Sequence, residues 1–202
     1  MALTITPYRR NGIGEVSTIG SSKTVACDTA KGFRNIAVGA IIAVSGVNRE
    51  VDGKVSETVV TITAAVDWSA ASEWKYTNPV LSLTGFYYIK HNKSDKPTVT
   101  PINRKDSQYT YAARGAGVVR EINISGYIQS STIADVYNNM TILESLADGS
   151  QTKEGTCIFA EDVPPRTSYV YITSVNWKYA RDQPKWLDVN VNMVECKNKG
   201  ST

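Results

Sequence analysis

The sequence has little of what hydrolytic and redox enzymes need, because its 202 residues include one histidine and three cysteines. Histidine is the commonest general base at neutral pH, but His91 has no adjacent carboxylate and no serine or cysteine motif that would mark a triad. The three cysteines, Cys27, Cys157 and Cys196, lie far apart and lack the spacing of metal ligands. We therefore expect a protein that is not an enzyme, that uses no cofactor or metal, and whose cysteines are buried, reduced thiols.

Long apolar runs are also scarce. The longest candidate, Ile36–Val44, is about half as long as the roughly 20 residues that a membrane-spanning helix needs, and it predicts a buried strand. The segment Met1–Gly12 lacks the charged, apolar and small-residue regions of a secretory signal. We expect assembly in a cytoplasm and no membrane insertion by this chain.

Alternating apolar and polar residues dominate the rest of the chain, and this pattern is typical of half-buried strands. The pattern is clearest in Glu57–Trp68, Glu121–Ile128 and Trp186–Cys196. Short polar segments containing proline separate the later strands, as in an antiparallel sheet. The sequence therefore predicts a mainly β protein, an antiparallel β-sandwich or small barrel.

One flanking α-helix is predicted at about residues 132–147. Thr132 can cap it, with Asp135 at the spacing of a capping box, and Gly149 supplies a left-handed stop. The apolar residues that we expect to face the sheet recur at helical spacing: Ile133, Tyr137, Met140, Leu143 and Ala147.

We expect residues 1–202 to form a single β-rich domain with an N-terminal arm at 1–16 and a long loop or arm at 91–117. The second segment contains Pro97 and Pro101, and it is long for a loop in a compact domain. Basic residues lie along this segment and at the position just before it: Lys90, Lys93, Lys96, Arg104, Lys105 and Arg114. The cluster could contact phosphates or acidic protein surfaces, or it could be a solvated loop.

The order of elements from Arg120 to Glu195 resembles the tail-tube superfamily of tailed viruses. A strand, a capped helix, a stop and three further strands carry the resemblance, in "REINISGYI", "TILESLADGSQ", "SYVYITSVNW" and "WLDVNVNMVEC". It covers about two fifths of the chain. The superfamily includes tube, distal-tail and baseplate-hub proteins, and the resemblance implies a β-sandwich with a flanking helix that forms a ring, of six subunits, or stacked rings around a channel.

The resemblance implies a virion structural protein of a viral tail, assembled in the host cytoplasm. Its partners would be further copies of itself and other tail proteins such as sheath, tape measure, terminator or baseplate, with DNA only as transiting cargo. The 91–117 arm would then supply interface residues: Arg104, Lys105, Tyr109, Tyr111 and Arg114. One departure is the net charge of +3, because tube channels in this superfamily are commonly acidic or neutral.

Other functions stay open at this stage. Within the superfamily, the chain could be a distal-tail or baseplate-hub component. In another class, it could be a carbohydrate- or receptor-binding β-sandwich that stacks ligands on Trp68, Trp74 and Tyr76, although such aromatics are more often core residues. A weaker alternative is a glycan-cleaving enzyme that uses scattered carboxylates: Asp148 and Glu154, or Glu161 and Asp162.

Overall fold

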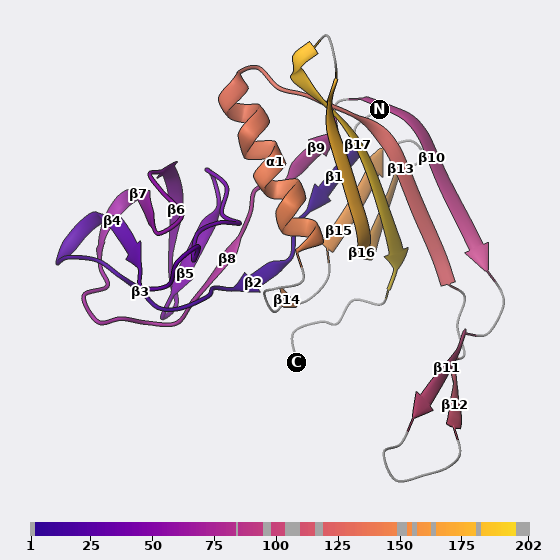
Figure 1. The fold of residues 1–202 in the computed structure, drawn as a ribbon, viewed down its shortest axis with the longest axis horizontal. Coiled ribbons are helices and arrows are strands. Elements are labelled where there is room, and N and C mark those ends of the chain that lie inside the picture. Colours follow the sequence, from indigo (N-terminus) through magenta and orange to yellow (C-terminus); the bar gives the residue numbers. More distant parts are fainter. Residues whose placement is uncertain are drawn as a thin grey trace.

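A computed structural model describes residues 3–83, 85–94, 98–103, 110–115, 119–148, 153–154, 157–162, 165–180 and 183–196; for 86–94, 98–103, 110–115, 119, 147, 153–154 and 180 it describes the backbone alone. Over these residues the protein is mainly β, with two curled antiparallel sheets, each a half-barrel, a separate two-stranded sheet and one helix (Figure 1). The predicted fold class is confirmed. We call the two halves the seven-stranded lobe and the eight-stranded lobe.

The seven-stranded lobe contains the long strands that the sequence predicts. Its order is β10 (Gly85–Ser94), β13 (Val119–Gln129), β17 (Gln183–Glu195), β16 (Pro165–Ala180), β15 (Cys157–Asp162), β1 (Leu3–Thr6) and β9 (Leu81–Leu83). The predicted alternation holds, because every second residue of β13 and β17 faces the core: Ile122, Ile124, Ile128, Leu187, Val189, Val191 and Met193. One face of this sheet is therefore apolar and the other polar.

Helix α1 (Ile133–Ala147) lies on the apolar face of this sheet and begins where predicted. Thr132 Oγ1 accepts a hydrogen bond from the Asp135 amide at 3.1 Å, and Asp135 Oδ2 accepts one from the Thr132 amide at 2.9 Å. Hydrogen bonds from the Ser131 and Thr132 hydroxyls lower the pKa of Asp135. The capping box is confirmed, whereas Gly149 lies outside the described residues.

The buried stripe of α1 differs from the predicted one. Leu143 is fully buried, but Ile133 and Tyr137 are 54% and 59% exposed. Leu143 packs into the core as predicted, and the predicted Met140 packs against it, but the other core residues of the helix are Val136, Ile142 and Leu146. The helix therefore turns aliphatic side chains from its first turn to its last toward the sheet.

The eight-stranded lobe is made of shorter strands. Its order is β14 (Lys153–Glu154), β2 (Arg9–Asn11), β8 (Trp74–Thr77), β5 (Ile41–Val44), β6 (Val47–Lys54), β7 (Val59–Asp67), β4 (Ser21–Cys27) and β3 (Val16–Ser17). Only the last four residues of the apolar run Ile36–Val44 form a strand. Ile36 and Ala40 are buried in the turn region before this strand. The core is rich in aromatic side chains: Phe33, Trp68, Trp74 and Tyr76.

The N-terminal segment contradicts the expected arm over residues 3–16. β1 pairs with β15 on one side and β9 on the other, and Leu3 and Ile5 are fully buried. Tyr8 is also buried, and its hydroxyl oxygen accepts a hydrogen bond from the Ile172 amide at 2.7 Å. Alternating small and apolar residues give this segment a strand pattern, so it completes the core of its own chain.

Polar side chains join the two lobes, whose apolar cores form separate clusters. Asn78 accepts a hydrogen bond from the Ala37 amide at 3.0 Å and donates to Ser145 Oγ of α1 at 2.9 Å. Asn138 of α1 accepts from the Val38 amide at 2.7 Å and donates to the Val38 carbonyl at 3.0 Å. The junction is therefore an amide-based contact between α1 and the 35–40 turn region.

The 91–117 segment contains more strand than the sequence predicts. β10 stays paired with β13 as far as Ser94 and Val119. The strands β11 (Thr98–Asn103) and β12 (Thr110–Gly115) then pair with each other as a hairpin. Figure 1 shows this hairpin beyond the ends of β10 and β13, away from both lobes.

Candidate subunit interface

The edge strand β10 is the first candidate contact surface. It is ten residues long, and among the described residues it pairs with β13 alone. The opposite edge of the same sheet, β9, has three residues. An edge strand presents unpaired backbone N–H and C=O groups, which a strand of another chain can satisfy.

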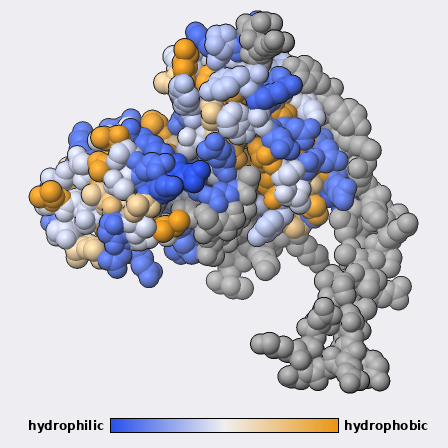
Figure 2. All heavy atoms as spheres, in the orientation of Figure 1, coloured by the Kyte–Doolittle hydropathy of each residue, from blue (hydrophilic) through white to orange (hydrophobic). Residues whose placement is uncertain are grey.

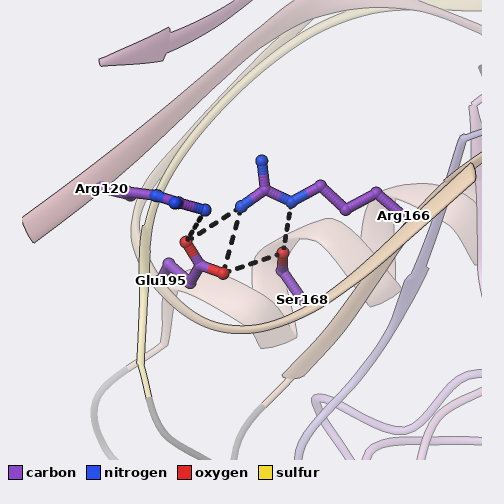
Figure 3. A network of polar contacts seen from close by, with 4 residues as sticks. All are labelled: Arg120, Arg166, Ser168 and Glu195. Carbon is purple, nitrogen blue, oxygen red and sulfur yellow. Dashed lines mark hydrogen bonds and ion pairs between the residues drawn. The ribbon is translucent and has the colours of Figure 1, made fainter. Parts of the chain in front are cut away.

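A network of charged side chains connects β13, β16 and β17 near the end of the β10–β13 pair, on the side of the hairpin (Figure 3). Arg166 Nη2 of β16 lies 3.1 and 3.0 Å from the two carboxylate oxygens of Glu195 on β17. Arg120 of β13 contacts the same carboxylate at 3.4 Å. Buried Ser168 donates to Glu195 at 3.3 Å and accepts from Arg166 Nε at 3.1 Å. One carboxylate thus holds three strands in register where the hairpin begins.

The cysteine beside this network is half-buried. Burial, with a smaller effect of the Glu195 carboxylate, raises the pKa of the Cys196 thiol. Cys27 and Cys157 are buried, and all three cysteines are free, as predicted. The Cys196 thiol is therefore a poor nucleophile at neutral pH.

The polar face of the seven-stranded sheet carries two uncharged rows at its centre. Asn190 of β17 donates to Ser125 of β13 at 2.8 Å and stands opposite Asn176 of β16. In the next row, Asn192 donates to Ser174 at 2.7 Å. A hollow of about 360 Å³ lies over part of this surface. The amides are thus engaged with neighbouring hydroxyls.

An aromatic pair closes one end of this face. Tyr127 of β13 and Trp186 of β17 stack with ring centroids 4.5 Å apart and an angle of 9°. A Cβ at Gly85 would lie 2.3 Å from the Tyr127 ring, so glycine is needed there for the ring to cover β10. The stack spans three strands and leads to the open edge.

The predicted interface residues are only partly placed. Arg104, Lys105 and Tyr109 lie outside the described residues. Tyr111 and Arg114 lie on β12, where the structure describes the backbone. The sequence did not predict the Arg120–Arg166–Glu195 network, because its members are 29 and 75 residues apart along the chain.

The aromatic platform of the carbohydrate-binding alternative is not available in this fold. Trp68, Trp74 and Tyr76 are 7%, 2% and 1% exposed, and all three belong to the core of the eight-stranded lobe. Their interpretation as core residues is confirmed. On the face shown in Figure 2, hydrophobic residues are scattered over both lobes.

Within the described part of the chain, no cluster of three or more histidine, cysteine or carboxylate side chains has the arrangement of a metal site. No described helix is long and apolar enough to cross a membrane. No protein-family model matches the chain, and no curated protein matches its sequence.

Proposed function

We propose that this protein is a virion structural protein that forms a ring of six subunits, or stacked rings, in a viral tail tube through which DNA passes. The open ten-residue edge of a curled antiparallel sheet carries the proposal. Pairing β10 with a different edge strand of the next copy, such as the three-residue β9, satisfies part of its free backbone groups. Because this contact joins two different edges, repeating it generates a closed ring or an open helix.

The polar sheet face supports passage of DNA. Proteins bind DNA non-specifically by placing lysine and arginine on its phosphates. The central rows of this face carry uncharged side chains instead, namely Asn123, Ser125, Ser174, Asn176, Asn190 and Asn192. With this face toward the channel, DNA meets amides and hydroxyls in these rows, and the neighbouring Lys178 is paired with Asp188 at 3.8 Å.

The hairpin supplies the second contact of the proposal. Ordering each backbone residue costs about 1–2 kcal/mol, so a hairpin outside both lobes needs contacts to compensate. A neighbouring subunit or ring provides them, with Arg104, Lys105 and Arg114 on carboxylates and Tyr109 and Tyr111 supplying apolar area. The Glu195 network ties together β13, β16 and β17 beside the end of the β10–β13 pair.

Two graded deletions test this proposal alongside the unchanged chain. Ser94 and Val119 are direct partners in the ladder, as are Asn103 and Thr110, so an Asn-Gly turn can replace 95–118 or 104–109 without a register change. We expect rings or tubes with a channel for the unchanged chain in negative-stain images. Replacing 104–109 weakens assembly, and replacing 95–118 abolishes it, while circular dichroism and a cooperative melt report a folded protomer.

Light scattering measures the oligomeric state independently. An unchanged chain that stays monomeric at high concentration contradicts the proposal. If both deletion variants assemble like the unchanged chain, β10 rather than the hairpin makes the contact, and the interface assigned to Arg104, Lys105, Tyr109, Tyr111 and Arg114 is wrong.

A further inference from the structure

The first half of β10 is the part of this edge strand that most needs a partner. β10 has ten residues and, among the described residues, pairs with β13 alone. Lys90 and Lys93 lie in its second half, and lysines on an edge strand hinder pairing with another chain. The first half, Gly85–Ile89, contains three aromatic residues and no charged one. This uncharged edge is therefore open to a strand from another copy.

The strands at the other sheet edges are short for this segment. β9 offers three residues, and the edges of the eight-stranded sheet, β14 and β3, offer two each. The hairpin strands β11 and β12 have six residues each and form a sheet of their own. A two-stranded hairpin is marginally stable by itself, so it gains from a third strand. Length therefore favours the hairpin as the partner of Gly85–Ile89.

Pro101 decides which hairpin strand has the open edge. It lies on β11 directly opposite Ala112 of β12. Proline has no N–H, and within sheets its nitrogen faces the free side of an edge strand, so this is a pair whose backbone groups point away from each other. The outer edge of β11 therefore lacks a donor at Pro101. The outer edge of β12 has the N–H and C=O groups of Thr110, Ala112 and Arg114.

The charges of the two strands set their relative direction. β12 has one charged residue, Arg114, and like charges opposite each other destabilise a strand pair. An antiparallel register with Arg114 beside Gly85 and Thr110 beside Ile89 keeps the arginine away from both lysines of β10. Parallel pairing would place it next to Lys90. Every strand pair that the structure describes is antiparallel as well.

The shape of β10 also fits a narrow partner. Its ladder with β13 shifts register between Phe86 and Tyr88. A bulge increases the local twist of a strand, and two-stranded ribbons twist more than wide sheets. A hairpin can therefore follow this stretch of β10 better than the edge of a wide sheet can.

We propose that β12 of a second copy pairs with Gly85–Ile89 of β10 in an antiparallel register. The inference rests on the proposed function, because it names the strand that joins one copy to the next. The contact joins two different surfaces of the chain, so it repeats from copy to copy. Its hydrogen bonds run between backbone groups, which the two open edges otherwise leave unpaired.

The test uses the full chain and two proline variants. Ala112→Pro removes an N–H from the outer edge of β12, and the matched control, Val99→Pro, removes one from the outer edge of β11. Neither changes a hydrogen bond inside the hairpin. We expect Ala112→Pro to raise the concentration at half-assembly about tenfold in light scattering, and Val99→Pro to leave it unchanged. Circular dichroism reports that both variants are folded.

Hydrogen exchange identifies the paired segment. Assembly of the unchanged chain should slow exchange within Gly85–Ile89, and Ala112→Pro should remove this protection while β17 keeps its own. The inference alone is overturned if the chain assembles while Gly85–Ile89 exchanges as in the monomer, or if the two proline variants assemble equally well. A chain that stays monomeric, with fast exchange along the outer edge of β10, overturns both the inference and the proposed function.

Discussion

The two lobes differ in the length of their strands and in the side chains that fill their cores. The seven-stranded lobe uses strands of up to 16 residues and an aliphatic core, whereas the eight-stranded lobe uses strands of two to nine residues and aromatic side chains. Among the described residues, the buried polar side-chain atoms without a partner all lie in the second lobe: Arg10 Nη2, Asn11 Oδ1, Arg49 Nε, Trp68 Nε1 and Trp74 Nε1.

The side chains that fill each core explain this difference. Long alternating strands fill one face with aliphatic groups that have no hydrogen bonds to satisfy. Short strands between turns need larger side chains to cover the core, and indoles bring N–H groups with them. Among the described residues, the buried polar groups of the seven-stranded lobe are therefore better satisfied than those of the eight-stranded lobe.

The largest effect is expected in the aromatic core. Phe33 is fully buried and lies edge-on to Trp74. Phe33→Ala should lower the free energy of unfolding by about 3–5 kcal/mol, because it leaves a large cavity. Hydrogen exchange should speed up in β7 and β8 while β13 and β17 keep their protection. An equal loss of protection from hydrogen exchange in both sheets would show that the two cores unfold as one unit.

A second substitution addresses the aliphatic core. Leu143 of α1 is fully buried, so Leu143→Ala should cost about 2–5 kcal/mol in chemical denaturation. Ile133→Ala on the same helix is the matched control, since Ile133 is 54% exposed, and it should change stability by less than about 0.5 kcal/mol. Equal costs would mean that the exposed stripe is covered in solution.

The junction between the lobes can be weakened alone. Asn78 is buried and connects Asn35, Ala37 and Ser145 through its amide. Asn78→Ala leaves buried polar groups without their hydrogen-bond partner and should lower the free energy of unfolding by about 1–3 kcal/mol. Asn190→Ala removes one exposed side-chain hydrogen bond and should cost less than about 0.5 kcal/mol. Two separated thermal transitions in the Asn78 variant would show that the amide contact couples the lobes.

The smallest effect concerns the helix cap. Thr132→Ala should cost about 1 kcal/mol at neutral pH. The pKa of Asp135 is lowered in the folded protein, so its stabilising contribution is complete above the ordinary aspartate pKa, about 3.9, and disappears as the pH falls through the lower folded value. The cost of Asp135→Asn should therefore shrink on acidification, as followed by urea titrations. A pH-independent cost would contradict the role of the carboxylate.

Local patterns predicted the strands around Ile124 and Val191 and the start of α1 at Thr132. Alternation and capping depend on neighbouring residues, so they can be recognised without knowing the fold. The buried stripe of α1 was predicted only in part, because Met140 and Leu143 pack on the core as expected whereas Ile133 and Tyr137 are exposed. Helical spacing allowed more than one apolar face, and the sheet selected the one with Val136 and Leu146, while Tyr137 stayed exposed because its polar end tolerates water.

By itself, the sequence determined a mainly antiparallel β protein with one capped helix, because backbone periodicity and capping act over a few residues. Only the tertiary structure decided that Leu3 and Ile5 complete a sheet, that Glu195 gathers Arg120 and Arg166, and that the two cores are separate. These features join residues tens of positions apart. Their pairing depends on the path of the chain, which no local pattern contains.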